Sequence, residues 1–282
     1  MRLDRFRTVD GFLEVAGSFL AEREAEHNLI LGISSGLGGD PDAADEPPYM
    51  AAVRDADRVV AAALRTPPYN LILSEVDDFA ALDSLVEDLR RSHGLPGVVG
   101  PPGAVAAFAG AWTATKGGSW AVVLDERIYR LSELRLPAPA PGSARLAVAA
   151  DRGLLEEWLI AFGIEALNEA DGERVRFGLD DWERGDGRRY WLWESDGRPV
   201  SLAGAGGETP NGIRIGPVYT PSAERGHGFA SNLTAFVSRA VMDEGRRFCF
   251  LYTNLANPTA NKIYQAIGYE PVADALMVSF AS

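Results

Sequence analysis

The chain has 282 residues, of which 27 are basic and 40 acidic, so its formal net charge at pH 7 is −13. This length suits two domains of similar size, and a surface this acidic repels phosphate backbones, which excludes nucleic acid as an expected partner. No apolar run approaches the roughly 18 to 20 residues that a transmembrane helix needs, and the N-terminus lacks the apolar core of a signal peptide. We therefore expect a cytoplasmic protein with no membrane partner.

Cysteine and histidine, two common kinds of metal ligand, are sparse in this chain. The single cysteine, Cys249, lies in the apolar run RFCFLYT, so internal disulfides and thiolate clusters are excluded. The three histidines have no ligand spacing, and we predict no metal site. Burial as an unreactive thiol is the preferred interpretation of Cys249.

A segment rich in proline divides the chain almost in half. It reads LRLPAPAPGSARL and covers residues 134–146. Proline and glycine at this density disfavour both a helix and a central strand, so the segment is typical of a semi-rigid linker. We expect a first domain over 1–136, a linker over 137–144 and a second domain over 145–282.

Hydrophobic periodicity predicts the same kinds of element on both sides of this linker. In chain order, the first half is expected to hold a helix over 11–24, strands over 49–54, 58–64 and 69–74, a helix over 78–91, a strand over 97–100, a helix over 103–115 and a strand over 121–131. The second half is expected to hold a helix over 153–170, strands over 190–195, 199–208 and 212–220, a helix over 230–245, a strand over 247–254, a helix over 257–268 and a strand over 275–280. The expected fold class is α/β with a mixed sheet, as two similar domains in tandem.

The run IGPVYTPSAERGHGFASNL at 215–233 predicts an anion site. A strand ends there, a glycine-rich turn follows, and a helix begins. The first turn of a helix exposes unpaired N–H groups, and glycines let them close around a phosphate. The expected pyrophosphate cradle is the backbone of Arg225, Gly226, His227, Gly228, Phe229, Ala230 and Ser231. A tight turn with no ligand remains the alternative at this point.

Two motifs in this half resemble those of the GNAT acetyltransferase superfamily. The first, Arg-x-x-Gly-x-Ala, is filled by Arg225, Gly228 and Ala230. The second follows about 25 residues later and is filled by Asn257, Ala260, Tyr264, Gly268 and Tyr269. The resemblance covers roughly residues 190–280 and implies a GNAT fold that binds acetyl-coenzyme A, with a degenerate GNAT-like domain in the first half.

The resemblance also implies roles for individual residues. Backbone groups of Val218, Tyr219 and Thr220 would pair with the pantetheine arm, as an added strand would. Asn257 and Asn261 would contact the cofactor, although capping of the following helix is an equally open role for Asn257.

Tyr264 is the expected catalytic acid, because in the family this tyrosine often protonates the departing thiolate. Its alternative is a packed aromatic ring whose hydroxyl makes a core hydrogen bond. For the general base, Glu208 and Glu194 are the candidates near the central strands, and solvent is the third possibility. His227 is expected to face solvent.

The first half has acids where the second half has its glycine loop. Glu75, Asp77 and Asp78 stand there, and their charges would repel a pyrophosphate. We expect this half to bind no coenzyme A and to shape the acceptor cleft, with an unrelated α/β domain as the alternative.

The predicted function is an N-acetyltransferase that moves an acetyl group to a primary amine by direct attack in a ternary complex. The acceptor would be a small molecule or a peptide; the oligomeric state is not predicted. Two alternatives stay open. One is a non-catalytic module that binds or senses acyl-coenzyme A. The other is a transferase with a longer acyl donor, for which Gly204, Gly206 and Gly207 leave space.

Overall fold

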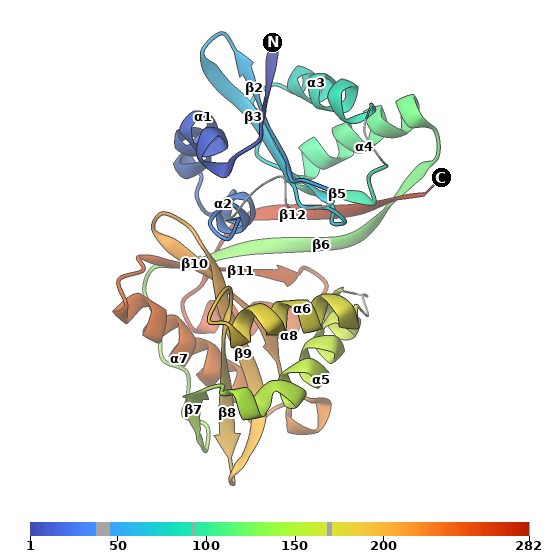
Figure 1. The fold of residues 1–282 in the computed structure, drawn as a ribbon. Helices are drawn as coiled ribbons and strands as arrows, with labels where there is room; N and C mark the ends of the chain where they lie inside the picture. Colours follow the sequence, from blue (N-terminus) through green and yellow to red (C-terminus); the bar gives the residue numbers. More distant parts are fainter. Residues whose placement is uncertain (38–45, 92–93, 168–170, 282) are drawn as a thin grey trace. The chain divides into compact units, whose positions relative to one another are not determined.

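The computed structural model describes residues 1–37, 46–91, 94–167 and 171–281. The chain forms two compact units: unit 1 is Met1–Ile128 with Val272–Ser282, and unit 2 is Tyr129–Pro271. Each unit combines helices with a mixed sheet (Figure 1), which confirms the expected α/β class. None of the helices in the described residues is long and apolar enough to cross a membrane.

Unit 1 holds the first ten elements of the chain. They are β1 (Arg2–Phe6), α1 (Val9–Glu22), α2 (Asn28–Ser34), β2 (Tyr49–Asp55), β3 (Arg58–Arg65), β4 (Leu71–Leu73), α3 (Ala80–Leu89), β5 (Gly97–Gly100), α4 (Pro102–Lys116) and most of β6 (Ser119–Leu131). Strands neighbour one another in the order β1-β2-β3-β4-β5-β12, where β12 is Glu270–Ala281. Only β4 and β5 of this series run parallel.

Alternation along β2 sends side chains to two separate cores. Met50 and Ala52 pack in the core that includes residues of α1 and α2. Ala51 and Val53 pack in the core that includes residues of α3 and α4. Figure 1 shows the two helix pairs on either side of β2 and β3. The sheet of unit 1 is therefore covered on both faces.

Unit 2 holds the expected glycine loop. Its elements are β7 (Ser143–Leu146), a 3₁₀ helix (Ala149–Asp151), α5 (Arg152–Phe162), a π-helical turn (Gly163–Leu167), α6 (Gly172–Glu183), β8 (Arg189–Ser195), β9 (Arg198–Glu208), β10 (Gly212–Tyr219), a 3₁₀ helix (Ser222–Glu224), α7 (Phe229–Asp243), β11 (Phe248–Asn254) and α8 (Pro258–Ala266). Strands neighbour in the order β11-β10-β9-β8-β7, and only β10 and β11 are parallel.

The sheet of unit 2 also has two covered faces. Tyr190 and Leu192 of β8 pack with residues of α5 and α6. Trp191 of β8 and Ile215 of β10 pack with residues of α7. The sheet therefore separates side chains on the face covered by α5 and α6 from side chains on the face covered by α7.

The structure departs from the sequence predictions at several elements. The helix expected over 153–170 ends as an α-helix at Phe162 and continues as the π-helical turn to Leu167, and residues 168–170 lie outside the described part. Among the described α-helices and strands, β1, α2, β7 and α6 were not predicted, and neither were the two 3₁₀ helices of unit 2. β7 begins at Ser143, inside the expected linker, whereas 134–140 form neither helix nor strand.

The division into compact units also differs from the expected domain boundaries. It falls after Ile128, and it assigns residues 272–282 to unit 1 rather than to the C-terminal domain. The physical reason is strand pairing, since β12 lies antiparallel to β5 with Val278 opposite Val98. The hydrogen bonds of β12 to β5 thus place residues 272–282 in unit 1, although these residues follow unit 2 in the sequence.

Candidate functional site

The parallel strands β10 and β11 separate in the middle of the sheet. Their pairing begins at Gly212 opposite Phe248 and ends at Arg214 opposite Phe250, although β11 continues to Asn254. On its other edge, β10 stays paired with β9 as far as Tyr219. Within the described residues, the edge of 215–219 that faces β11 is therefore unpaired. An extended ligand could add to such an edge as a strand does.

The loop that follows β10 has the geometry of an anion cradle. Gly226 and Gly228 have φ angles of 83° and 80°, a left-handed conformation that favours glycine. Asn232 is the first residue of α7 to bond back, from its N–H to the Gly228 carbonyl at 3.0 Å. The N–H groups of the first helical turn precede it and have no partner within the helix. A Cβ atom at Gly226 would meet nothing within 4 Å, so the loop is open at this residue, whereas a Cβ atom at Gly228 would lie 3.7 Å from Ala140 Cβ.

The side chains of Phe229 and His227 in this loop contact other parts of unit 2. Phe229 is buried in the core under α7. His227 is exposed, stacks on Phe229 with ring centroids 5.4 Å apart, and has Nδ1 at 3.3 Å from the Glu224 carbonyl oxygen. The buried side chain of Phe229 therefore leaves only the backbone of this residue accessible to a ligand.

Arg225 is held by an internal carboxylate that the sequence analysis missed. Its Nη2 lies 2.5 Å from Glu165 Oε2, and its Nε donates to the Thr220 carbonyl at 2.9 Å. The Tyr219 hydroxyl donates to Glu165 Oε1 at 3.2 Å, and burial followed by the Glu165 charge raises the pKa of Tyr219. Glu165 lies in the π-helical turn, 60 residues from Arg225. No local sequence signal connects the two.

The two asparagines of the second motif order the start of α8. Asn257 Oδ1 accepts the Ala260 N–H at 3.0 Å, which confirms its capping role. Asn261 Nδ2 donates to the Asn254 and Asn257 carbonyls at 3.0 and 2.7 Å, and its Oδ1 accepts from the Tyr129 hydroxyl at 2.8 Å. Both amide donors of Asn261 are engaged within the protein. Contact of either residue with a cofactor stays a prediction.

Tyr264 is a half-buried ring with an uncommitted hydroxyl. It meets Tyr269 edge to face, with centroids 6.0 Å apart. The core hydrogen bond considered as its alternative role is not present among the described residues. Burial raises the pKa of Tyr264 to about 12, so the phenol stays protonated at neutral pH. It can therefore act as a hydrogen-bond donor.

The carboxylates considered as general bases are both in ion pairs. Glu208 contacts Arg246. It lies opposite Ile213 near the start of β10, whereas the glycine loop follows the other end of this strand. Its role as a base stays a prediction.

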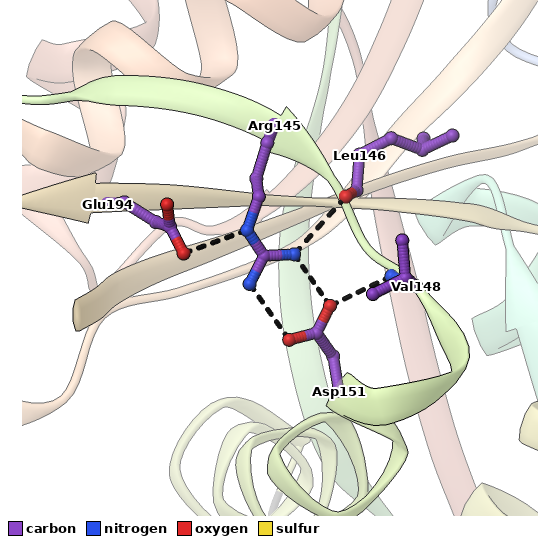
Figure 2. A network of polar contacts seen from close by, with 5 residues as sticks. All are labelled: Arg145, Leu146, Val148, Asp151 and Glu194. Carbon is purple, nitrogen blue, oxygen red and sulfur yellow. Dashed lines mark hydrogen bonds and ion pairs between the residues drawn. The ribbon is translucent and has the colours of Figure 1, made fainter. Parts of the chain in front are cut away.

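Glu194 belongs to a network around Arg145 (Figure 2). Arg145 Nε donates to Glu194 at 2.8 Å, and its Nη1 and Nη2 donate to Asp151 at 2.6 and 2.9 Å. Asp151 also accepts the Val148 N–H at 2.8 Å. These contacts lower the pKa of Asp151, chiefly through the Arg145 hydrogen bonds. The network joins β7, β8 and the turn before α5, so Glu194 has a structural function.

Cys249 is fully buried, and burial raises the pKa of its thiol to about 12. A thiol with this pKa is a poor nucleophile at neutral pH, because almost none of it is thiolate. The expected burial of Cys249 is confirmed.

The acids of unit 1 at the position that matches the glycine loop also make structural contacts. Asp77 pairs with Arg58 at 2.6 Å, and Asp78 Oδ1 accepts the Ala80 N–H at 3.0 Å at the start of α3. Burial raises the pKa of the Glu75 carboxyl. Three acidic side chains gathered at this turn would oppose a bound phosphate.

Separated parallel strands that lead into a glycine loop and a helix define unit 2 as a GNAT-type fold. Residues 153–269 match the sequence profile of the Acetyltransferase (GNAT) family. The chain therefore contains a domain of the GNAT acetyltransferase family, as the resemblance of the two motifs implied. No curated protein matches the chain by sequence.

Solved structures share the fold of the whole chain. A tandem GNAT protein from the clavulanic acid biosynthesis pathway aligns with a TM-score of 0.57 and 16% identity over 99% of this chain and 98% of its own. A Drosophila protein aligns with a TM-score of 0.70 and 11% identity over 99% and 98%. A GCN5-related N-acetyltransferase from Kribbella flavida aligns with a TM-score of 0.56 and 17% identity over 79% and 87%. These matches establish the tandem GNAT fold.

Proposed function

We propose that this chain is an N-acetyltransferase that transfers the acetyl group of acetyl-coenzyme A directly to a primary amine. The observation that supports this most is the continuity of two backbone features in unit 2. The unpaired edge of 215–219 is followed by the short 3₁₀ helix Ser222–Glu224 and then by the glycine loop and the first turn of α7. A ligand with an extended amide arm and a pyrophosphate fits that order of groups.

The binding roles follow from this geometry. Val218, Tyr219 and Thr220 would pair with the pantetheine arm through their backbone. The N–H groups of 226–231 would surround the pyrophosphate, because a helix N-terminus and glycine backbone favour an anion. Arg225 would add its charge once its contact with Glu165 is exchanged for phosphate.

The chemical step needs a donor at the departing sulfur. The amine nitrogen attacks the thioester carbonyl, the carbon–nitrogen bond forms, and the carbon–sulfur bond breaks. Tyr264 would donate a hydrogen bond to the sulfur as negative charge develops. With a pKa of about 12 against roughly 8.5 for an ordinary thiol, the phenol stabilises the thiolate without full proton transfer. The amine proton would leave to solvent or to Glu208.

The first test is calorimetric titration of acetyl-coenzyme A into the wild type and Ala230→Glu. Ala230 lies in the first turn of α7, where an added acid suits the helix dipole but repels a pyrophosphate. We expect binding to weaken at least tenfold, about 1.4 kcal/mol. The matched control is Ala106→Glu on the exposed surface of α4, which should bind as the wild type does.

The outcomes of this titration distinguish the acyltransferase proposal from its alternatives. No binding to the wild type overturns the acyltransferase proposal. Equal binding by wild type and Ala230→Glu places the cofactor elsewhere. Binding as expected, followed by no transfer to any amine in a broad panel, favours the non-catalytic module.

A further inference from the structure

Two arginines share one face of the unit 2 sheet, with a glycine between them. Arg189 lies opposite Ala205 in the pairing of β8 with β9, so Arg188 reaches the level of Gly206. Arg214 of β10 lies opposite the same Gly206. A Cβ atom at Gly206 would lie 3.1 Å from both Cα and Cβ of Arg188, and side chains of paired residues share a face. Both arginines therefore stand on the face of α5 and α6.

The Arg188 side chain extends to the point where β10 leaves β11. Its Nη1 donates to the carbonyl oxygen of Gly216. A Cβ atom at Gly204 would lie 3.0 Å from Arg188 Cδ and 3.0 Å from the Gly216 oxygen. The space over Gly204 and Gly206, considered above as room for a longer acyl chain, is thus filled by this arginine. The charge stands beside the strand opening where the transfer is proposed.

The charge of Arg188 is not neutralised by its described surroundings. In a chain with a net charge of −13, no carboxylate of the described residues pairs with it, and its recorded hydrogen bond goes to a backbone carbonyl. Burial, with the neighbouring charge of Arg214, lowers the pKa of Arg188 to about 10, so it remains cationic at neutral pH. A desolvated cation gains much from an anion that pairs with it.

We propose that Arg188 binds a carboxylate carried by one of the two substrates, the amine acceptor or the acyl group. The guanidinium fork offers two parallel N–H groups, which match the two oxygens of a carboxylate. Gly206 contributes no side chain between Arg188 and Arg214, so the Arg188 side chain can lie over it and reach the strand opening at Gly216. This inference rests on the proposed function, since it assigns a substrate class to that site.

The test uses substrate pairs that differ only in a carboxylate. Tyrosine is compared with tyramine, and histidine with histamine, as acceptors of acetyl-coenzyme A. In a second arm, succinyl-coenzyme A is compared with butyryl-coenzyme A. The expected result in one arm is a kcat/KM at least tenfold higher for the member with the carboxylate. Arg188→Gln should reduce this ratio towards one, and Arg188→Lys should retain part of it.

A binding arm separates failure of this inference from failure of the proposed function. The acceptor pairs are titrated calorimetrically into the wild type and Arg188→Gln with coenzyme A present, which measures carboxylate binding without turnover. Acylation with no carboxylate preference in either arm overturns the inference alone, as does a preference that Arg188→Gln leaves unchanged. If no amine is acylated and neither member of a pair binds more tightly, both proposals fail. Circular dichroism checks that each variant is folded.

Discussion

The side chain of Arg225 is already engaged by a carboxylate before any phosphate reaches it. Glu165 lies 2.5 Å from Arg225 and 3.2 Å from the Tyr219 hydroxyl. Both partners of the ion pair are about half exposed, so the pair itself is worth at most about 1 kcal/mol. A phosphate bound at the loop as proposed would have to displace this internal anion, so we expect Glu165 to lower the affinity of the loop for coenzyme A.

Glu165→Gln should tighten the binding of coenzyme A by up to about fivefold, because about 1 kcal/mol of competition is removed. Calorimetry at low salt measures this effect, and added salt should diminish it. Glu173→Gln, which removes an exposed acid from α6, is the control for net charge. Weaker binding by Glu165→Gln would show that Glu165 supports the loop instead of competing for it.

Tyr264→Phe should lower kcat by about a hundredfold, the low end of the range for losing one hydrogen-bond donor to a developing charge, while the Kd for acetyl-coenzyme A stays within about twofold. Only the transition state carries charge on sulfur, so cofactor binding does not need the hydroxyl. Tyr269→Phe is the matched control. Its hydroxyl lies 2.8 Å from Ser238 Oγ in the core, so its loss should lower the Tm and leave kcat unchanged. Full activity of Tyr264→Phe would remove Tyr264 from the chemistry.

At the scale of elements, the Arg145 network holds the short strand β7 in unit 2. β7 has only four residues, too few for hydrophobic alternation to reveal it. Arg145 joins it to Asp151 and to Glu194 of β8 (Figure 2). The short strand β7 is thus held by ion pairs of Arg145 as well as by its backbone hydrogen bonds to β8. This explains why the sequence analysis placed a linker here.

Asp151→Asn should lower the free energy of unfolding by about 1 to 2 kcal/mol, because the charged hydrogen bonds to Arg145 are lost. Glu194→Gln should cost less than about 1 kcal/mol, since a single contact of a partly exposed pair is removed. Urea denaturation at pH 7 compares the two variants with the wild type. Equal costs would mean that the bidentate contact of Asp151 contributes no more stability than the single contact of Glu194.

At the scale of the whole molecule, folding brings together segments that are far apart in the chain. Unit 1 contains both ends of the chain, since residues 272–282 join Met1–Ile128. Neither unit is therefore defined by the proline-rich segment alone. Local composition predicts a division at the proline-rich segment, whereas the compact units follow strand pairing such as that of β12 with β5.

The stability of the protein should depend on pH through His27, a buried histidine of unit 1. His27 is 2% exposed, its Nδ1 lies 3.0 Å from the Leu20 carbonyl, and its Nε2 accepts the Glu75 N–H at 3.0 Å. Burial lowers the pKa of His27 from 6.5 to about 4. Below pH 6.5 the unfolded chain binds a proton that the folded one does not, so stability falls as the pH falls towards 4.

Between pH 7 and pH 5, the His27 contribution should reduce the free energy of unfolding by about 2 kcal/mol. Urea denaturation of the wild type and His27→Gln at both pH values isolates this part. His27→Gln should be less stable than the wild type at pH 7, and it should lose less stability than the wild type between pH 7 and pH 5. An identical pH dependence in both proteins would show that His27 is not buried in its neutral form.

The sequence by itself determined the features that depend on neighbouring residues. The turn of glycines before α7, the cap of Asn257 on α8 and the family motifs all arise within a few residues, where backbone sterics and local hydrogen bonds decide the conformation. Only the tertiary structure decided where β10 leaves β11, which carboxylate holds Arg225, and which side chain fills the space over Gly204 and Gly206. These features depend on strand register and on contacts between residues tens of positions apart, because folding, not local sequence, brings such residues within bonding distance.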